Sequence, residues 1–215
     1  MGKKKRNKVL LLHGLYMHGS VMWPLAQRLK QREWETECLS YNSVAIRAES
    51  LYDRILSALP QDQPAYLVGH SLGGVLLYHL AHAVPLPLGS RIVTLGSPLQ
   101  GALLARRLAQ WNLSALLGNA GEHGLLRDQP VVWHSDAALG SLAGGTGFGM
   151  GTLLGAPRRD SDGTVLIEET RIAGMRDHKV LPVTHTSMLL SAEVARQTDQ
   201  FLRYGYFDQS DCSKR

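Results

Sequence analysis

The feature that most constrains the fold is the run at residues 66–74, which reads Tyr-Leu-Val-Gly-His-Ser-Leu-Gly-Gly. An apolar stretch typical of a buried strand leads into the pattern Gly-x-Ser-x-Gly, and an apolar helical pattern at 72–83 follows it. This order predicts a sharp turn between a strand and a helix, with Ser71 at its apex. Gly69 and Gly73 lack side chains, so the strand and the helix can approach closely around the serine. Because such a turn strains the backbone, it favours a reactive serine over a structural one.

Strand-length apolar runs alternate with helical patterns along the chain. The predicted strands lie at 8–12, 36–41, 65–68, 91–95, 139–143 and 179–183. The predicted helices lie at 23–30, 46–59, 72–83, 103–117 and 187–203. The alternation predicts an α/β fold, with a mostly parallel sheet of about six strands, helices on both faces and right-handed crossovers.

The chain has 215 residues, of which 44% are hydrophobic and 19% charged, enough for one sizeable core. We expect a single domain at 8–207, a disordered basic tail at 1–7 and a polar tail at 208–215. The net charge of +5 equals the five basic residues among the first eight. The remainder is balanced, which argues against a nucleic-acid-binding face. The basic tail favours at most a weak contact with an anionic membrane surface.

No apolar run reaches the roughly 18 residues of a membrane span, so we expect no transmembrane segment. The apolar stretch 9–12 is too short for a signal peptide. Cys38 and Cys212 form neither a disulfide framework nor a metal spacing. These features predict a cytoplasmic protein. The glycine-rich segment 144–155 is expected to be a surface loop, with Phe148 and Met150 as an apolar lip.

A Gly-x-Ser-x-Gly pattern arises by chance in about one sequence in six of this composition, so further groups must support it. A nucleophilic serine needs a base, and the base needs an orienting carboxylate. In strand–turn–helix sites the expected chain order is serine, acid, histidine. His185 follows the predicted strand 179–183 and precedes a predicted helix. This places it at the carboxyl edge of the sheet, where sites in open α/β sheets assemble.

The best candidate for the acid is Asp162, in the polar turn Ser-Asp-Gly-Thr-Val at 161–165. Gly163 gives the backbone freedom to aim the carboxylate. Asp160 is a competitor, but its neighbours are arginines and an ion pair explains it more simply. Asp177 would precede the last strand and lie at the wrong end of it.

His79 and His82 are spaced three apart on a predicted helix, which could suggest a metal pair. No third ligand is evident, so they are interpreted as helix-surface residues and no metal is expected. An oxyanion in acyl transfer needs two backbone N–H donors. The residue after the nucleophile, Leu72, should supply one, and the loop after the first strand the other. Leu15 is the first choice in that loop, and Gly14 is the next.

Four segments resemble the α/β-hydrolase family of lipases and esterases. They are VLLLHGL at 9–15, YLVGHSLGG at 66–74, VTLGSPLQGA at 93–102, and SDGTV at 161–165 with VTHTSML at 183–189. The resemblance implies a Ser71–His185–Asp162 triad and no metal or organic cofactor. The chain is similar in scale to the small lidless lipases, because the family's first antiparallel strands and a separate lid domain are not evident.

The predicted activity is hydrolysis of small-molecule or lipid-like carboxylic esters through an acyl-enzyme on Ser71. The apolar residues at 99–117 could line an acyl pocket, or they could belong to the core, as such spacing on one helix face usually indicates. An acyltransferase or a thioesterase using the same triad stays open, as does a non-catalytic relative that only binds ligands.

Overall fold

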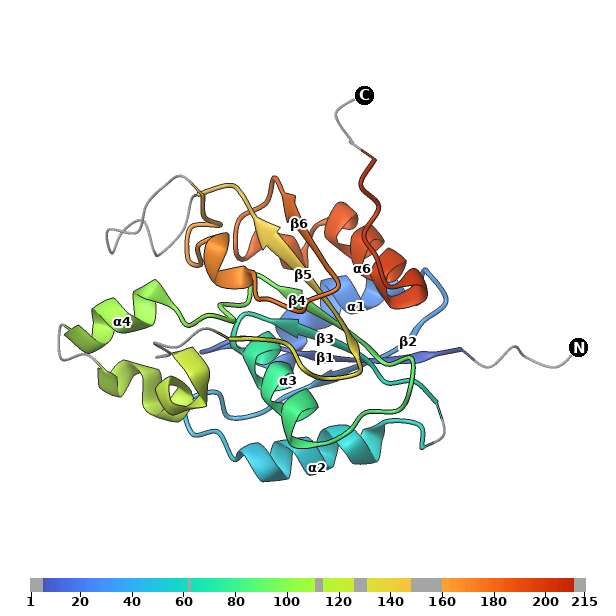
Figure 1. Ribbon diagram of the computed structural model, residues 1–215, viewed down its shortest axis with the longest axis horizontal. Helices are drawn as coiled ribbons and strands as arrows, with labels where there is room; N and C mark the ends of the chain where they lie inside the picture. Colours follow the sequence, from blue (N-terminus) through green and yellow to red (C-terminus); the bar gives the residue numbers. More distant parts are fainter. Residues whose placement is uncertain (1–5, 62, 111–113, 126–130, 148–159, 211–215) are drawn as a thin grey trace, which may run out of the picture.

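A computed structural model describes residues 6–61, 63–110, 114–125, 131–147 and 160–210. Within these residues, six parallel strands form one sheet in the order β2-β1-β3-β4-β5-β6 (Figure 1). The strands are β1 Lys8–Leu12, β2 Glu35–Leu39, β3 Tyr66–His70, β4 Arg91–Leu95, β5 Ala138–Gly144 and β6 Asp177–Leu181. The prediction of a six-stranded α/β fold is confirmed.

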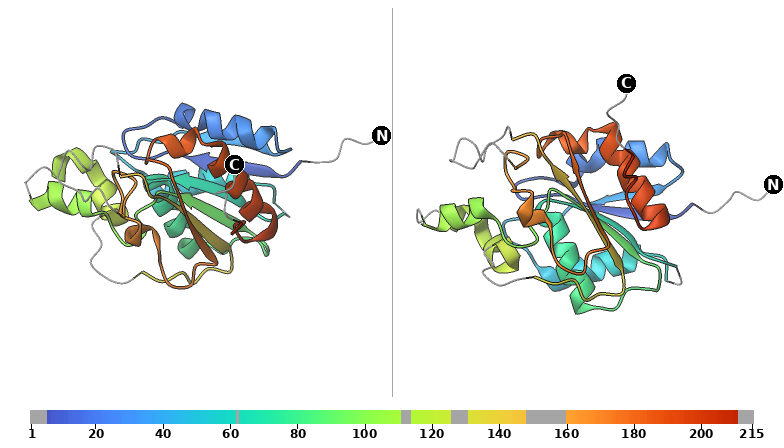
Figure 2. Two further views of the ribbon diagram at one scale, coloured as in Figure 1. Left: turned by 90° about the horizontal axis from the view of Figure 1, so that it is seen from above. Right: turned by 45° about the horizontal axis from the view of Figure 1, so that its top comes forward.

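Helices cover both faces of the sheet (Figure 2). The α-helices are α1 Trp23–Lys30, α2 Ala48–Ala58, α3 Leu72–Ala83, α4 Leu103–Gln110 and α6 Ala192–Tyr204. Short 3-10 or π turns occupy Gly19–Met22, Ser114–Ala120, Gly121–Leu125, Glu168–Thr170 and Ser187–Leu189. Helices α1 and α6 pack on one face, while α2 and α3 pack on the other.

The apolar run that forms β1 suits an interior strand, which lies between β2 and β3 and is covered on both faces. Alternate side chains of a strand point to opposite faces. Val9 and Leu11 enter the core under α1 and α6, whereas Leu10 and Leu12 enter the core under α2 and α3. All four side chains are fully buried, as expected for a strand covered on both faces.

The prediction of one helix over residues 103–117 is wrong. Helix α4 ends at Gln110, and a separate 3-10 segment occupies Ser114–Ala120. Tertiary contacts fix the second segment. The Asn119 side chain accepts a hydrogen bond from Ile46 N–H at 2.7 Å and donates to its carbonyl at 2.8 Å. These contacts outweigh the helical pattern of the sequence.

Three predicted strands shift by one or two residues. Strand β3 spans Tyr66–His70 rather than 65–68. Strand β2 ends at Leu39 rather than at residue 41, and β6 spans Asp177–Leu181 rather than 179–183. The earlier end of β6 leaves three residues between the strand and His185, rather than one. The predicted C-terminal helix is preceded by the separate 3-10 turn Ser187–Leu189, and α6 begins at Ala192.

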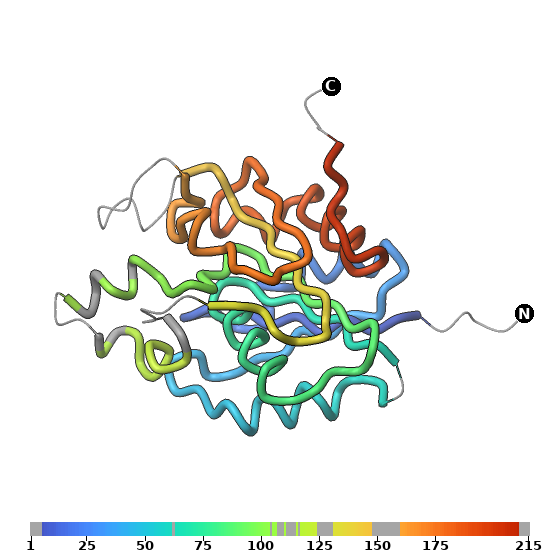
Figure 3. Tube along the Cα trace, in the orientation of Figure 1, coloured from blue at the N-terminus to red at the C-terminus, as the bar shows by residue number. Residues whose placement is uncertain are grey.

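Several predictions fall outside the described residues. These are most of the basic tail, the end of the C-terminal tail, and residues 148–155 of the glycine-rich loop with Phe148 and Met150. Among the residues that the structure describes, no helix is long and apolar enough to span a bilayer. The chain enters the sheet at Lys8, and α4 lies on the opposite side of the molecule from the start of β1 (Figure 1, Figure 3).

Candidate active site

Ser71 lies on the sharp turn that the sequence predicts, between the end of β3 and the start of α3. Its φ of 53° and ψ of −122° are sparsely populated for a residue with a side chain. The Ser71 N–H donates to Leu95 O at 2.9 Å, which holds the turn against the end of β4. A Cβ on Gly69 would lie 2.4 Å from Gly74 N, and one on Gly73 would lie 2.6 Å from His13 O. The glycines around the serine are therefore needed for close backbone approach.

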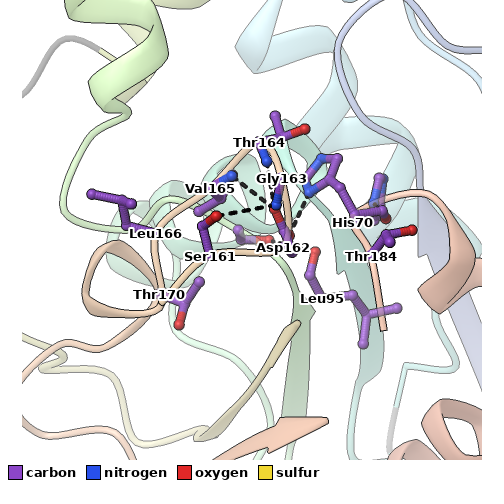
Figure 4. A network of polar contacts seen from close by, with 12 residues as sticks. His70, Leu95, Ser161, Asp162, Gly163, Thr164, Val165, Leu166, Thr170 and Thr184 are labelled. Atoms are coloured by element: carbon purple, nitrogen blue, oxygen red, sulfur yellow. Dashed lines mark hydrogen bonds and ion pairs between the residues drawn. The ribbon is translucent and has the colours of Figure 1, made fainter. Parts of the chain in front are cut away.

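Asp162 and His185 form a buried hydrogen-bonded pair. Asp162 Oδ1 accepts hydrogen bonds from Thr164 N–H at 2.9 Å and Val165 N–H at 2.8 Å (Figure 4). Asp162 Oδ2 accepts from His185 Nδ1 at 2.7 Å, and the His185 N–H donates to Asp162 O at 2.9 Å. Because the carboxylate can only accept, Nδ1 carries the proton in the neutral form of His185, and Nε2 then carries the lone pair. The pair thus presents the tautomer that a general base requires.

Two glycines make room for this pair. At the end of β5, a Cβ on Gly144 would lie 2.6 Å from Asp162 Cβ, so the acid loop returns to the carboxyl end of that strand. After β4, Gly96 has a φ of 53°. A Cβ there would lie 2.8 Å from Asp162 Oδ2 and 3.1 Å from His185 Nδ1. Neither position has room for a side chain.

His185 lies beside the turn that carries Ser71. His70, the residue before Ser71, donates from Nε2 to the His185 carbonyl at 3.0 Å, and the two rings are 4.6 Å apart. Strands β3, β4 and β5 are neighbours in the sheet. The structure therefore brings Ser71, Asp162 and His185 to one carboxyl edge, as the chain order predicts.

The loop after β1 lies against Ser71, because a Cβ on Gly14 would be 3.0 Å from Ser71 Cβ. His13 Nε2 accepts from Tyr41 N–H at 3.2 Å, so its Nδ1–H donates to Gly14 O at 2.8 Å. In a planar trans peptide the C=O and the N–H point in opposite directions. The Leu15 N–H therefore points away from the His13 ring.

Of the amides in this loop, that of Tyr16 is occupied, because it donates to Ser43 Oγ at 2.9 Å. Within the described part of the chain, the Leu15 N–H has no hydrogen-bond partner. Leu15 and, after it, Gly14 therefore stay the candidate oxyanion donors in this loop, and the Tyr16 amide does not. The Leu72 N–H lies at the amino end of α3, where the helix dipole favours negative charge.

Two further histidines of this edge stay neutral. Burial, above all, lowers the pKa of His13. Burial and the neighbouring His185 lower the pKa of His70 to about 3. Neither ring adds a positive charge near His185.

The comparisons identify the family. The family model described as the alpha/beta hydrolase family matches residues 9–203, which is most of the chain. The chain belongs to the alpha/beta hydrolase family.

Solved structures of other hydrolases share its fold. The mature form of Bacillus licheniformis lipase BlEst2 is 16% identical over 92% of this chain and 91% of that chain, with a TM-score of 0.61. The pyrethroid hydrolase PytH is 12% identical over 94% and 99%, with a TM-score of 0.64. The thioesterase RedJ of the prodiginine pathway in Streptomyces coelicolor is 16% identical over 95% and 92%, with a TM-score of 0.53. A comparison with curated protein sequences gives no match.

The structure describes both rival acids, and it gives the Asp177 carboxylate partners of its own. Asp177 begins β6, where its carboxylate accepts from His178 N–H at 2.8 Å and Phe207 N–H at 2.7 Å. It lies at the amino end of the strand, away from Ser71. Asp160 has a φ of 58°, and its carbonyl accepts from Ile167 N–H at 2.8 Å.

On α3, the structure describes the hydrogen bonds of His82. His82 Nδ1–H donates to Tyr78 O at 2.8 Å, and its Nε2 accepts from His134 N–H at 3.3 Å. Among the described residues, no three histidine, cysteine, aspartate or glutamate side chains gather as metal ligands would.

The sequence interpretation missed the contacts of His13 and His70 and the space-making roles of Gly96 and Gly144. A histidine at the end of an apolar strand was the available signal in the first two cases, since a buried imidazole needs hydrogen-bond partners. For the glycines, the signal was their position: Gly96 directly follows the predicted strand 91–95, and Gly144 directly follows the predicted strand 139–143.

Proposed function

We propose that this member of the family is a serine hydrolase that cleaves carboxylic esters through an acyl-enzyme on Ser71. The observation that carries the proposal is the buried Asp162–His185 hydrogen bond of 2.7 Å, beside a serine with a φ of 53° at a strand–helix turn. A serine hydroxyl is a weak nucleophile unless a base takes its proton. This arrangement supplies a base whose tautomer is fixed by a buried acid.

In the acylation step, His185 Nε2 takes the proton from Ser71 Oγ while Oγ attacks the ester carbonyl carbon. The imidazolium that forms is stabilised by Asp162, which stays ionised. The tetrahedral intermediate then collapses. The C–O bond to the alcohol breaks, and His185 returns its proton to the leaving alkoxide.

The negative charge on the intermediate needs donors placed in advance. We assign the Leu15 and Leu72 amides to this role, and the loss of one such donor typically costs about 3–4 kcal/mol of transition-state stabilisation. The Ser71 amide is not available, since it donates to Leu95 O. The amino end of α3 adds a favourable dipole.

In the deacylation step, His185 removes a proton from water as the water oxygen attacks the acyl carbon. The second intermediate collapses to a carboxylic acid and free Ser71, which regains its proton from His185. Every proton is returned by the end of the cycle, so the proposed reaction requires no metal and no organic cofactor.

Small-molecule or lipid-like esters are the proposed substrate class. The neighbours' names, a lipase and a pyrethroid hydrolase, support this class, and the RedJ neighbour adds thioesters as the second candidate. Of the apolar residues at 99–117, the described buried members Leu99, Ala105 and Leu117 pack into the core under α3. They support the core interpretation, while Trp111 and Leu113 lie outside the described residues.

A chain-length series tests the proposal. Purified wild type and Ser71→Ala are compared on p-nitrophenyl esters of increasing acyl length, with matched thioesters and with alcohols as acceptors. We expect hydrolysis by the wild type that Ser71→Ala lacks, with esters preferred over thioesters. Equal turnover by both proteins would refute the proposal. A preference for thioesters, or for transfer to alcohols, would replace ester hydrolysis with the corresponding alternative.

A further inference from the structure

His70 combines complete burial with an incomplete set of hydrogen bonds. Its side chain is 0% exposed, and Nε2–H donates to the His185 carbonyl at 3.0 Å. Its other nitrogen, Nδ1, is buried without a hydrogen-bond partner among the described residues. Leaving a buried polar atom unpaired is destabilising. An aliphatic side chain would fill this space without that cost, so packing alone does not explain a histidine here.

The contacts of His70 reach three parts of the proposed site: Ser71, the loop of His185 and the loop of Leu15. The main chain joins it directly to Ser71, and its one strong hydrogen bond goes to the backbone of His185. Its Nδ1 lies on the other side, 3.3 Å from where a Cβ on Gly14 would be. The ring therefore lies between the loop that carries the base and the loop that carries the Leu15 amide. Figure 4 shows it near Asp162 and Leu95.

We infer that His70 is a positioning residue, which ties the loop of His185 to the nucleophile turn through its Nε2–H···O=C hydrogen bond. The inference rests on the proposed function, because it assigns His70 a role in aligning the base with Ser71. Rate depends steeply on such alignment, since a misplacement of about 1 Å can cost about 100-fold.

The charge state of His70 supports this role. Burial, the neighbouring His185 and the nearby His13 lower the pKa of His70 to about 3. The ring therefore stays neutral when His185 becomes an imidazolium during the reaction. A protonated His70 would place a second positive charge 4.6 Å from the His185 ring and oppose that step.

Matched substitutions separate positioning from packing. In glutamine the side-chain nitrogen is as many bonds from Cα as Nε2 is in histidine, so His70→Gln keeps an N–H donor in place. His70→Met has similar length and no donor. His70→Asn carries the amide of glutamine on a side chain that is one methylene shorter. It replaces His70→Met in the comparison if the methionine variant does not fold. Thermal unfolding shows which variants are folded.

Steady-state kinetics on p-nitrophenyl acetate give the first readout. We expect His70→Met and His70→Asn to lower kcat at least about 10-fold with little change in KM, and His70→Gln to recover most of the loss. A purely structural role predicts lower stability with an unchanged kcat in every folded variant. That result, or an equal loss of kcat in all three, would overturn the inference.

Proton NMR gives a readout that does not depend on turnover. The proton in the His185 Nδ1–Asp162 Oδ2 hydrogen bond should give a downfield signal in the wild type and in His70→Gln, and that signal should be shifted or lost in His70→Met. An identical signal in all proteins would contradict the inference. If the wild type hydrolyses no ester beyond Ser71→Ala but the signal still responds in this way, the proposed function fails and the positioning role stands.

Discussion

Substituting Gly96 by alanine tests the geometry of the acid–base pair. A Cβ at this position would lie 2.8 Å from Asp162 Oδ2, and ordinary contact begins at 3.4 Å. The carboxylate would therefore have to move by about half an ångström, on the scale at which van der Waals overlap becomes costly. Since a shift of about 1 Å can cost 100-fold in rate, we expect Gly96→Ala to lower kcat by about 10-fold to 100-fold.

The same substitution also places alanine at a φ of 53°, and that backbone cost needs its own control. Gly89 has a φ of 84°, and a Cβ there would meet only Pro64, at 3.4 Å or beyond. Gly89→Ala should therefore lose about 1 kcal/mol of stability, or about 2–4 °C in Tm, with unchanged kcat.

Ester hydrolysis and thermal unfolding of both variants, measured side by side, complete the test. A wild-type kcat in Gly96→Ala would refute the reasoning about the acid–base pair. An equal loss of kcat in Gly89→Ala would show that backbone strain alone explains the loss of kcat in Gly96→Ala.

Three further predictions follow from the site and its histidines. Ser71→Gly should be more stable than Ser71→Ala by about 1 kcal/mol in thermal unfolding, because only glycine adopts the positive φ of residue 71 without strain. Equal Tm values for the two variants would show that the turn is unstrained. Since the pKa values of His70 and His178 are lowered to about 3 and about 4, the unfolded chain binds protons below pH 6.5 that the native protein does not. The free energy of unfolding should therefore fall from pH 6.5 towards pH 4, less steeply in His178→Asn, and a rise measured by urea unfolding would contradict this. His13→Phe should lower kcat about 10-fold, because it removes the hydrogen bond from the His13 ring that holds the loop after β1. Leu15→Ala keeps the backbone amide and should lower kcat much less. A larger loss of kcat in Leu15→Ala than in His13→Phe, measured by ester hydrolysis, would contradict the assignment of the Leu15 amide to the oxyanion site.

The sheet could be predicted because its pattern is local. The run Val9, Leu10, Leu11 and Leu12 buries every side chain, so it indicates a strand covered on both faces without knowledge of its partners. The turn at Ser71 is also local, since the glycines that permit it lie within three residues of the serine. Chain order and the sheet-edge rule then placed Asp162 and His185.

What could not be predicted depends on contacts between distant parts of the chain. A 3-10 segment at Ser114–Ala120 replaces the end of the helix predicted at 103–117, and Asn119 in this segment pairs with Ile46, 73 residues away. The partner of His70 is the carbonyl of His185, which is 115 residues away. Gly96 is required only because the acid–base pair, from a later loop, packs against it. None of these contacts leaves a periodic signal in the sequence.

The most direct test of the account is covalent labelling with a fluorophosphonate, followed by intact-protein mass spectrometry and peptide mapping. The account predicts a single adduct on Ser71 in the wild type, no adduct in Ser71→Ala, and strongly slowed labelling in His185→Ala and Asp162→Asn. An unlabelled wild type, or an adduct that persists in Ser71→Ala, would contradict the central claim that Ser71 is the nucleophile of this hydrolase.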